Sequence, residues 1–414
     1  MRLTTTTYSR GVWSVFAIRA IETLGWSATI PFFAIYLLNE RTVSLPIIGT
    51  IYLISGASSF ATQILGGRLS DQYGPRLITI LALGGGAGLA GLLAEMITLS
   101  SSVFMLASLF TMYSVVRGLY IPSTSAVVAT EPRTAISSSF SIVYIGGNLG
   151  YMVGPAIGGL LIQSDSYSAI FALCAVTTIV AALVTAIWMS LTKSDCISEP
   201  VKLERRQSYW LKWKTDKIII MFLVLVFFLS YSNGYQNTPL SLFAANFVHL
   251  DTASIGYIYA TNGLTVVLLQ FPLIRLINRI TDNLTLSLAI SCISTCVSCL
   301  LAGISSNFLQ LEFVMFCLTI GEIFLSVPAQ SMLALFSTSW NRGTYQGYYF
   351  AFSESGKNLC LFLGPLSFAL LAKQVYLAWD IVAVFSLLIF AGFIILSPRV
   401  RSKYIQDART TDIK

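Results

Sequence analysis

Charge is scarce in this sequence: Asp, Glu, Lys and Arg make up 10% of its 414 residues, whereas hydrophobic residues make up 55%. A water-soluble protein of this length cannot cover its surface with so few charges, so the composition predicts a membrane-embedded protein. The net charge of +7 does not indicate nucleic acid as a partner. Most Lys and Arg lie in every second connecting segment or in the two tails, which predicts that both termini are cytoplasmic.

Histidine and patterned cysteine are lacking as well. The single histidine, His249, falls in an expected outer connection, and the seven cysteines have neither disulfide nor zinc spacing. There is also no nucleotide-binding loop and no sizeable soluble domain, so a membrane enzyme or sensor is disfavoured and no cofactor is expected. Cys292, Cys296 and Cys299 share one helical face, which leaves a soft-metal site as the alternative to packing by small residues. Because no carboxylate or histidine is near, we expect packing and no metal.

Long apolar runs dominate the rest of the chain. About 20 apolar residues cross a bilayer, and twelve such runs can be placed. The first six are Val12–Leu38, Ile47–Leu65, Leu77–Leu99, Val103–Thr130, Ile136–Ile162 and Ala169–Ser190. The last six are Ile218–Phe243, Ile255–Phe271, Leu284–Ile304, Leu309–Leu335, Gln346–Leu371 and Leu377–Leu396.

The longest polar stretch divides these runs into two halves. Residues 1–192 are expected to form one six-helix bundle, 193–217 a cytoplasmic linker, and 218–414 a second bundle with a short cytoplasmic tail. Trp210 and Trp213, with neighbouring lysines, fit an amphipathic piece on the inner leaflet, and a plain flexible linker is the alternative.

The two halves repeat each other. Gly146-Gly147-Asn148-Leu149 with Gly154-Pro155 recurs as Gly356-Lys357-Asn358-Leu359 with Gly364-Pro365, at a spacing of about 210 residues. Such parallel repeats place a substrate site at the bilayer midplane. The predicted fold is all-α, with twelve transmembrane helices in two pseudo-symmetric six-helix bundles around a central cavity.

A tight, charged turn separates the second and third runs. Its spacing Gly-x-x-x-Asp-x-x-Gly-x-Arg comprises Gly67, Asp71, Gly74 and Arg76, an acid and a base at opposite ends of one turn. The turn resembles the loop between helices 2 and 3 of the major facilitator superfamily, although Gln72 replaces the usual arginine. The resemblance implies a gating loop, in which Asp71 approaches a helix N-terminus of the other half and latches the outward-open state.

A second motif lies in the fifth run, which reads Gly-x-x-x-Gly-Pro-x-x-Gly-Gly from Gly150, through Gly154 and Pro155, to Gly158 and Gly159. Glycines four residues apart give a flat face for close helix contact. The motif looks like that of the superfamily's drug:proton antiporters, in which it is associated with export. Ordinary packing by small residues is the alternative.

Ionisable residues inside apolar runs are costly and usually mark a pathway. The proton-coupling candidates are Glu22, Glu322, Glu354 and Arg117. Glu22 is the first choice, because Arg117 could approach it, and a local pair with Arg19 is its alternative. The alternative for Glu322 is a hydrogen bond to a neighbouring backbone, and Glu354 could simply neutralise Lys357 three residues on.

Aromatic residues are plentiful in the runs expected to line the cavity. The substrate-contact candidates are Trp26, Tyr113, Tyr144, Tyr231, Tyr235 and Tyr348. Their apolar faces and hydroxyls suit amphipathic or cationic solutes, and packing or lipid anchoring is the alternative. We expect a monomeric transporter that lies in the lipid of the cell membrane. It is expected to export a small organic solute in exchange for protons, by alternating access. The alternative is a same-fold carrier for a defined metabolite (an organic acid, sugar or lipid) by symport or uniport.

Overall fold

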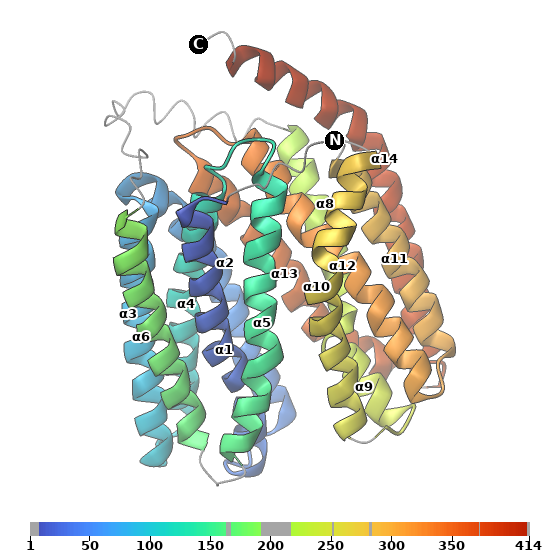
Figure 1. Cartoon of the computed structure of the whole chain (residues 1–414). Coiled ribbons are helices and arrows are strands. Elements are labelled where there is room, and N and C mark those ends of the chain that lie inside the picture. The colour runs from blue at the N-terminus through green and yellow to red at the C-terminus, as the bar shows by residue number, and fades with distance from the viewer. Residues whose placement is uncertain are drawn as a thin grey trace. The chain divides into compact units, whose positions relative to one another are not determined.

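A computed structural model describes residues 8–162, 167–191, 217–250, 252–280, 284–371 and 373–411, and every regular element in them is helical (Figure 1). The predicted linker, residues 193–217, lies outside this described part except for its last residue. The helices are α1 (Arg10–Asn39), α2 (Leu45–Tyr73), α3 (Pro75–Thr98), α4 (Val103–Val128), α5 (Ile136–Ile162), α6 (Tyr167–Leu191), α8 (Lys217–Asn233), η1 (Gly234–Gln236), α9 (Thr238–Asn246), α10 (Thr252–Ile280), α11 (Leu284–Ile304), α12 (Phe308–Phe336), α13 (Arg342–Leu370) and α14 (Tyr376–Thr411).

Within the described residues, 11 helical segments are long and apolar enough to cross a membrane. They correspond to eleven of the twelve predicted runs. The remaining run lies in α13, which has 29 residues and is therefore about 43 Å long. Its length suffices for a bilayer, but Glu354 and Lys357 lie in its middle and make it more polar than the other spans.

One predicted run is not a continuous helix. The segment Lys217–Asn246 consists of α8, the short 3-10 helix η1 and α9, so the α-helix is interrupted at Gly234–Gln236. Asn237 has φ −86° and ψ −126°, and Pro239 follows in the first turn of α9, where its missing N–H costs nothing. The apolar run reveals the span, but the break depends on these local backbone preferences.

Two compact units share the chain. The first contains residues 1–194 and 337–351, so the beginning of α13 belongs with α1–α6, although the sequence assigned it to the second bundle. In this unit α1 packs on α5 and α6, α3 on α4 and α6, and α2 on α4. In the second unit, residues 195–336 and 352–414, α11 packs on α12 and α14, and α10 packs on α12.

The glycines of α5 bring it unusually close to α1. A Cβ at Gly150 would lie 2.7 Å from the Ala20 carbonyl oxygen, and one at Gly154 would lie 2.4 Å from that of Leu24. The Ser27 hydroxyl donates to the Gly150 carbonyl at 3.1 Å across this contact. Larger side chains would separate the two backbones, so these glycines determine how α1 is held.

The second unit contains the equivalent contact. A Cβ at Gly356 of α13 would lie 2.2 Å from the Phe227 carbonyl oxygen of α8, much as one at Gly146 would lie 2.8 Å from that of Phe16. These are the glycines that the repeat pairs. The cysteine face on α11 also packs: Cys296 and Cys299 belong to the apolar core of this unit with Trp379.

Candidate functional site

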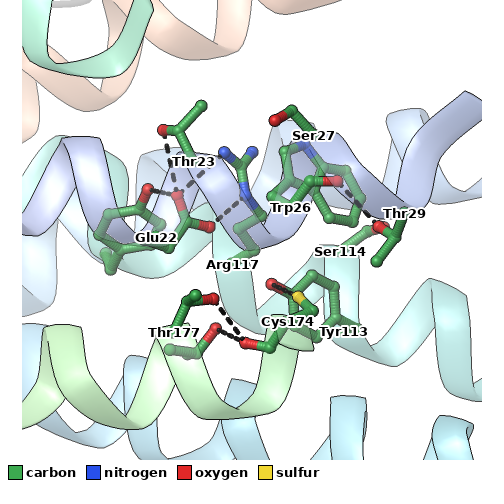
Figure 2. Close-up of polar contacts among 12 residues, drawn as sticks. Glu22, Thr23, Trp26, Ser27, Thr29, Tyr113, Ser114, Arg117, Cys174 and Thr177 are labelled. Carbon is green, nitrogen blue, oxygen red and sulfur yellow. Dashed lines mark hydrogen bonds and ion pairs between the residues drawn. The ribbon is translucent and has the colours of Figure 1, made fainter. Parts of the chain in front are cut away.

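Glu22 is the centre of a charged cluster buried in the first unit. Only 1% of its side chain is exposed, although it lies in the middle of α1. Arg117 of α4 donates from Nε to Glu22 Oε1 at 2.6 Å and from Nη2 to Oε2 at 3.3 Å. Tyr120, one turn further along α4, donates its hydroxyl to Oε2. The carboxylate is thus held by a forked guanidinium and a phenol, a strong charge-assisted arrangement (Figure 2).

Aromatic rings hold the guanidinium of Arg117 from the other side. Its Cζ lies 4.7 Å from the centroid of the Trp26 ring, a cation–π contact. Trp26 in turn stacks on Tyr113 at 5.2 Å and on Phe110 at 5.8 Å. The Tyr113 hydroxyl lies 3.3 Å from the Cys174 sulfur of α6 (Figure 2). Arg117 therefore lies between a carboxylate and a rigid aromatic stack, and 16% of its side chain remains exposed.

Glycines set the position of α4 behind this cluster. A Cβ at Gly118 would lie 2.4 Å from the Thr62 hydroxyl oxygen, and one at Gly66 would lie 2.4 Å from the Leu119 carbonyl oxygen. The backbones of α2 and α4 meet at these two residues. The Arg117-Gly118 pair therefore combines a charged group with the close contact that positions it.

Arg19 does not form the local pair with Glu22 that was the alternative to a coupling role for Glu22. Its Nη2 donates to the Ser125 hydroxyl at 3.4 Å, and its Cζ lies 5.5 Å from both the Tyr120 and the Phe350 ring centroids. Within the described residues no carboxylate oxygen lies within salt-bridge distance of Arg19. The cluster thus combines two guanidinium groups with one carboxylate.

Asp71 caps the beginning of α13. Its Oδ1 accepts from the Gly343 amide at 2.7 Å, and its Oδ2 accepts from the Thr344 amide at 2.8 Å and the Thr344 hydroxyl at 2.5 Å. An anion is favoured at a helix N-terminus, where amides are unpaired and the dipole is positive. The sequence motif predicts an Asp71 contact of this kind but not which helix receives it.

The other residues of the turn have separate roles. A Cβ at Gly67 would lie 2.1 Å from the Gly343 carbonyl oxygen, so this glycine allows α2 and α13 to touch. Gly74 has φ 87°, a conformation that side chains disfavour, and it separates α2 from α3. Arg76, at the other end of the turn from Asp71, donates to the Ala186 carbonyl of α6 at 2.9 Å.

The carboxylates of the second unit have different surroundings. Glu322 accepts from the Asn262 amide of α10 at 3.1 Å. Glu354 and Lys357 form an ion pair of 3.2 Å one turn apart, with 39% of the Glu354 side chain exposed. Of the four candidate carboxylates and cations, the structure brings together only Glu22 and Arg117.

The aromatic candidates divide between packing and exposed positions. Tyr113, Tyr235 and Tyr348 are almost fully buried, and Tyr235 packs against Trp379 at 5.4 Å. Tyr144, Tyr231 and Trp26 retain partly exposed surface. The helix 5 residues Gly158 and Gly159 are likewise placed by packing: a Cβ at either would meet Phe32.

Comparison with known proteins identifies the family. The model of the Major Facilitator Superfamily matches residues 15–357, most of the chain. The chain belongs to this superfamily. Its function is therefore transport rather than enzymatic catalysis, and its many apolar helices are those of a multi-pass membrane protein.

Curated members of the superfamily align over most of their length. The uncharacterized MFS-type transporter YdeE of Escherichia coli K12 is 24% identical over 330 residues, 78% of this chain and 80% of that protein. The Na(+), Li(+), K(+)/H(+) antiporter of Planococcus maritimus is 22% identical, covering 88% of this chain and 90% of its own. Multidrug resistance protein MdtG of Escherichia coli O9:H4 is 23% identical, and the alignment covers 77% of this chain and 76% of that protein.

The fold has a solved counterpart. The crystal structure of the human organic anion transporter MFSD10 (TETRAN) superposes with a TM-score of 0.74, covering 93% of this chain and 99% of that one. The two sequences are 15% identical, so the similarity concerns the superfamily fold alone.

Several polar residues around the two carboxylates were not predicted from the sequence. Tyr120, one turn after Arg117, donates to Glu22, and Asn262 donates to Glu322. Thr319 and Gln236 contact Asn262 in turn. An amide side chain in the middle of an apolar run is the signal that could have found Asn262. Its partners are separated from it by up to 60 residues, so spacing alone does not reveal them.

Proposed function

We propose that the protein is a proton-coupled secondary transporter that exports amphipathic organic compounds by alternating access, with Glu22 as the proton carrier. The observation that carries this proposal is the buried Glu22–Arg117–Tyr120 cluster. Inward proton movement supplies about 2.3 kcal/mol per charge per 100 mV. Similarity to the multidrug resistance protein MdtG supports drug efflux, and similarity to the Planococcus antiporter supports proton exchange.

The chemistry follows from the charges. An ionised Glu22 balances Arg117 through two hydrogen bonds, so neither charge stands alone in the bilayer. A proton on the carboxyl removes that balance and releases the guanidinium, which is already partly exposed at 16%. A change in the position of Arg117 is then the step that links proton binding to a conformational change, because an unpaired intramembrane cation is costly.

Topology and gating complete the proposal. The chain would form two six-helix bundles in the cell membrane, with both termini in the cytoplasm and residues 193–217 as the cytoplasmic linker. Asp71 would stabilise the outward-open state by holding the first turn of α13, and would release it during each cycle. Trp26, whose ring faces Arg117, would contact the substrate, and the fold would act as a monomer.

The test uses proteoliposomes with an inward proton gradient and a panel of lipophilic cations, following substrate flux and internal pH together. Wild type is expected to couple the two fluxes, and Glu22→Gln is expected to abolish the proton flux. Glu95→Gln is the matched control, because Glu95 is an exposed carboxylate in a span of the same unit. Coupling that survives intact in folded Glu22→Gln would exclude Glu22 as the carrier.

Arg19 favours a second candidate, a carrier for organic acids. Arg117 pairs with Glu22, whereas Arg19 contacts Ser125 and the Tyr120 ring, so the cluster carries a second positive charge that an organic anion would neutralise. The same liposomes distinguish the candidates: this reading requires uptake of aromatic carboxylates to exceed that of their ammonium analogues, and to fall in Arg19→Gln.

A further inference from the structure

A second polar cluster lies in the other unit, where the membrane span Lys217–Asn246 is interrupted. The helix α8 ends at Asn233, and the residues of η1, Gly234–Gln236, are buried. Non-helical backbone at membrane depth is tolerated only where protein or a polar site satisfies it. Asn233 secures the end of α8 by donating from Nδ2 to the Leu318 carbonyl of α12 at 3.3 Å.

Three oxygen acceptors surround a single amide nitrogen in this cluster. The Nδ2 of Asn262 faces three acceptors: the Thr319 hydroxyl at 2.9 Å, Glu322 Oε2 at 3.1 Å and Gln236 Oε1 at 3.4 Å. An amide nitrogen carries two hydrogens, so it cannot satisfy all three. The Thr319 hydroxyl gives its own hydrogen to the Met315 carbonyl at 2.8 Å and therefore acts here only as an acceptor.

The Gln236 side chain and the end of α8 also present partial negative charge to this cluster. Gln236 directs Nε2 to Asn233 Oδ1 at 3.2 Å, which leaves its Oε1 toward Asn262. The C-terminal end of α8, at Asn233, carries the negative end of the helix dipole. A carboxylate, neutral oxygens and a helix C-terminus together form an environment complementary to a positive charge.

We propose that Glu322, Thr319 and Gln236 bind a monovalent cation, with Asn262 holding the oxygens in place. The ligand is either an alkali-metal ion or the protonated amine of an amphipathic substrate, since each presents a positive charge that these oxygens can surround beside the Asn262 amide. The described residues contain no group of three or more His, Cys, Asp or Glu side chains that could hold a metal ion. Alkali ions and ammonium groups do not need one, because neutral oxygens and a single carboxylate suffice.

This inference deepens the proposed function, on which it rests for its place in a transport cycle. It assigns proton binding to Glu22 in one unit and cation binding to Glu322 in the other. A bound cation neutralises Glu322 on α12, whereas a bound proton neutralises Glu22 on α1. The second candidate function, carriage of organic acids, would leave this cluster without a ligand.

The test measures binding to purified full-length protein by calorimetry. The probes are LiCl, NaCl and KCl, together with phenethylammonium chloride and its neutral analogue phenylethanol. Glu322→Gln is expected to lower cation affinity roughly tenfold or more, and Thr319→Val roughly threefold to tenfold. Glu354→Gln is the matched control, because that carboxylate is exposed and paired with Lys357. The cation affinity of this variant should equal that of wild type.

The outcomes separate the ligands and the two proposals. Binding of alkali ions alone identifies an ion site, and binding of phenethylammonium but not phenylethanol identifies a substrate-amine site. No cation binding by wild type, or equal binding by wild type, Glu322→Gln and Thr319→Val, would overturn the inference. Glu22→Gln should keep cation affinity and lose proton flux, so intact proton flux there refutes the proposed function while leaving the cation site standing.

Discussion

The cap formed by Asp71 on α13 gives the most direct physical prediction. Its carboxylate accepts two backbone N–H groups and one hydroxyl, from Gly343 and Thr344. In Asp71→Asn one oxygen is replaced by an NH2 group, which is itself a donor and must face either the Gly343 amide or the donors of Thr344. The variant therefore loses the contacts of one oxygen together with the negative charge at a helix N-terminus.

The magnitude follows from these contacts. Hydrogen bonds to charged groups contribute about 1.5–3 kcal/mol each, and a charge at a helix end about 0.3–1 kcal/mol. Because Asn retains one acceptor and water replaces part of the loss, we expect a net change of about 2–3 kcal/mol. Opening of the first turn of α13 should then be roughly 30- to 150-fold more populated.

Hydrogen exchange followed by mass spectrometry measures this opening directly. Peptides containing the Gly343 and Thr344 amides should exchange roughly 30- to 150-fold faster in Asp71→Asn, while peptides from α11 should be unchanged. Asp380→Asn, which removes a carboxylate from α14, serves as the control. Equal exchange of the α13 peptides in wild type and Asp71→Asn would show that this cap does not hold the helix.

Three further substitutions test the packing and the charge pairs. Gly154→Val should lower the free energy of unfolding by about 1–3 kcal/mol, because its side chain would meet the Leu24 carbonyl, and a lower Tm of the purified protein would report this. Arg117→Lys should keep the charge but lose the fork on Glu22, reducing proton-coupled flux in liposomes by roughly tenfold. Glu354→Gln should change coupled flux less than about twofold, because it lies in an exposed local pair.

The spans were predictable because length and hydropathy alone determine them. Eleven of the twelve predicted runs correspond to spans of the described residues, and the polar α13 carries the twelfth. The interruption at Gly234–Gln236 was not predicted, because an apolar run looks the same whether or not its helix is continuous. Only the local sequence around Asn237 and Pro239 contains that information.

The candidate site was predictable where both partners are charged. Glu22 and Arg117 stand out in apolar runs, and the cost of burying each charge alone explains why they meet at 2.6 Å. Neutral partners leave no such signal, since a tyrosine such as Tyr120 is common in any span. The partner of Arg76 was not predicted for a related reason, because a guanidinium can be satisfied by any accessible carbonyl, here that of Ala186.

The two clusters are unequal in a way that bears on coupling. In the first unit the carboxylate of Glu22 is paired with the permanent cation Arg117, so adding a proton there increases the positive charge of the cluster. In the second unit Glu322 meets an amide, and adding a cation there removes a negative charge. Both events shift charge in the same direction, so a cycle that allowed both at once would accumulate positive charge inside the bilayer. Alternate loading of the two sites avoids that cost, and proton–cation exchange requires the same alternation.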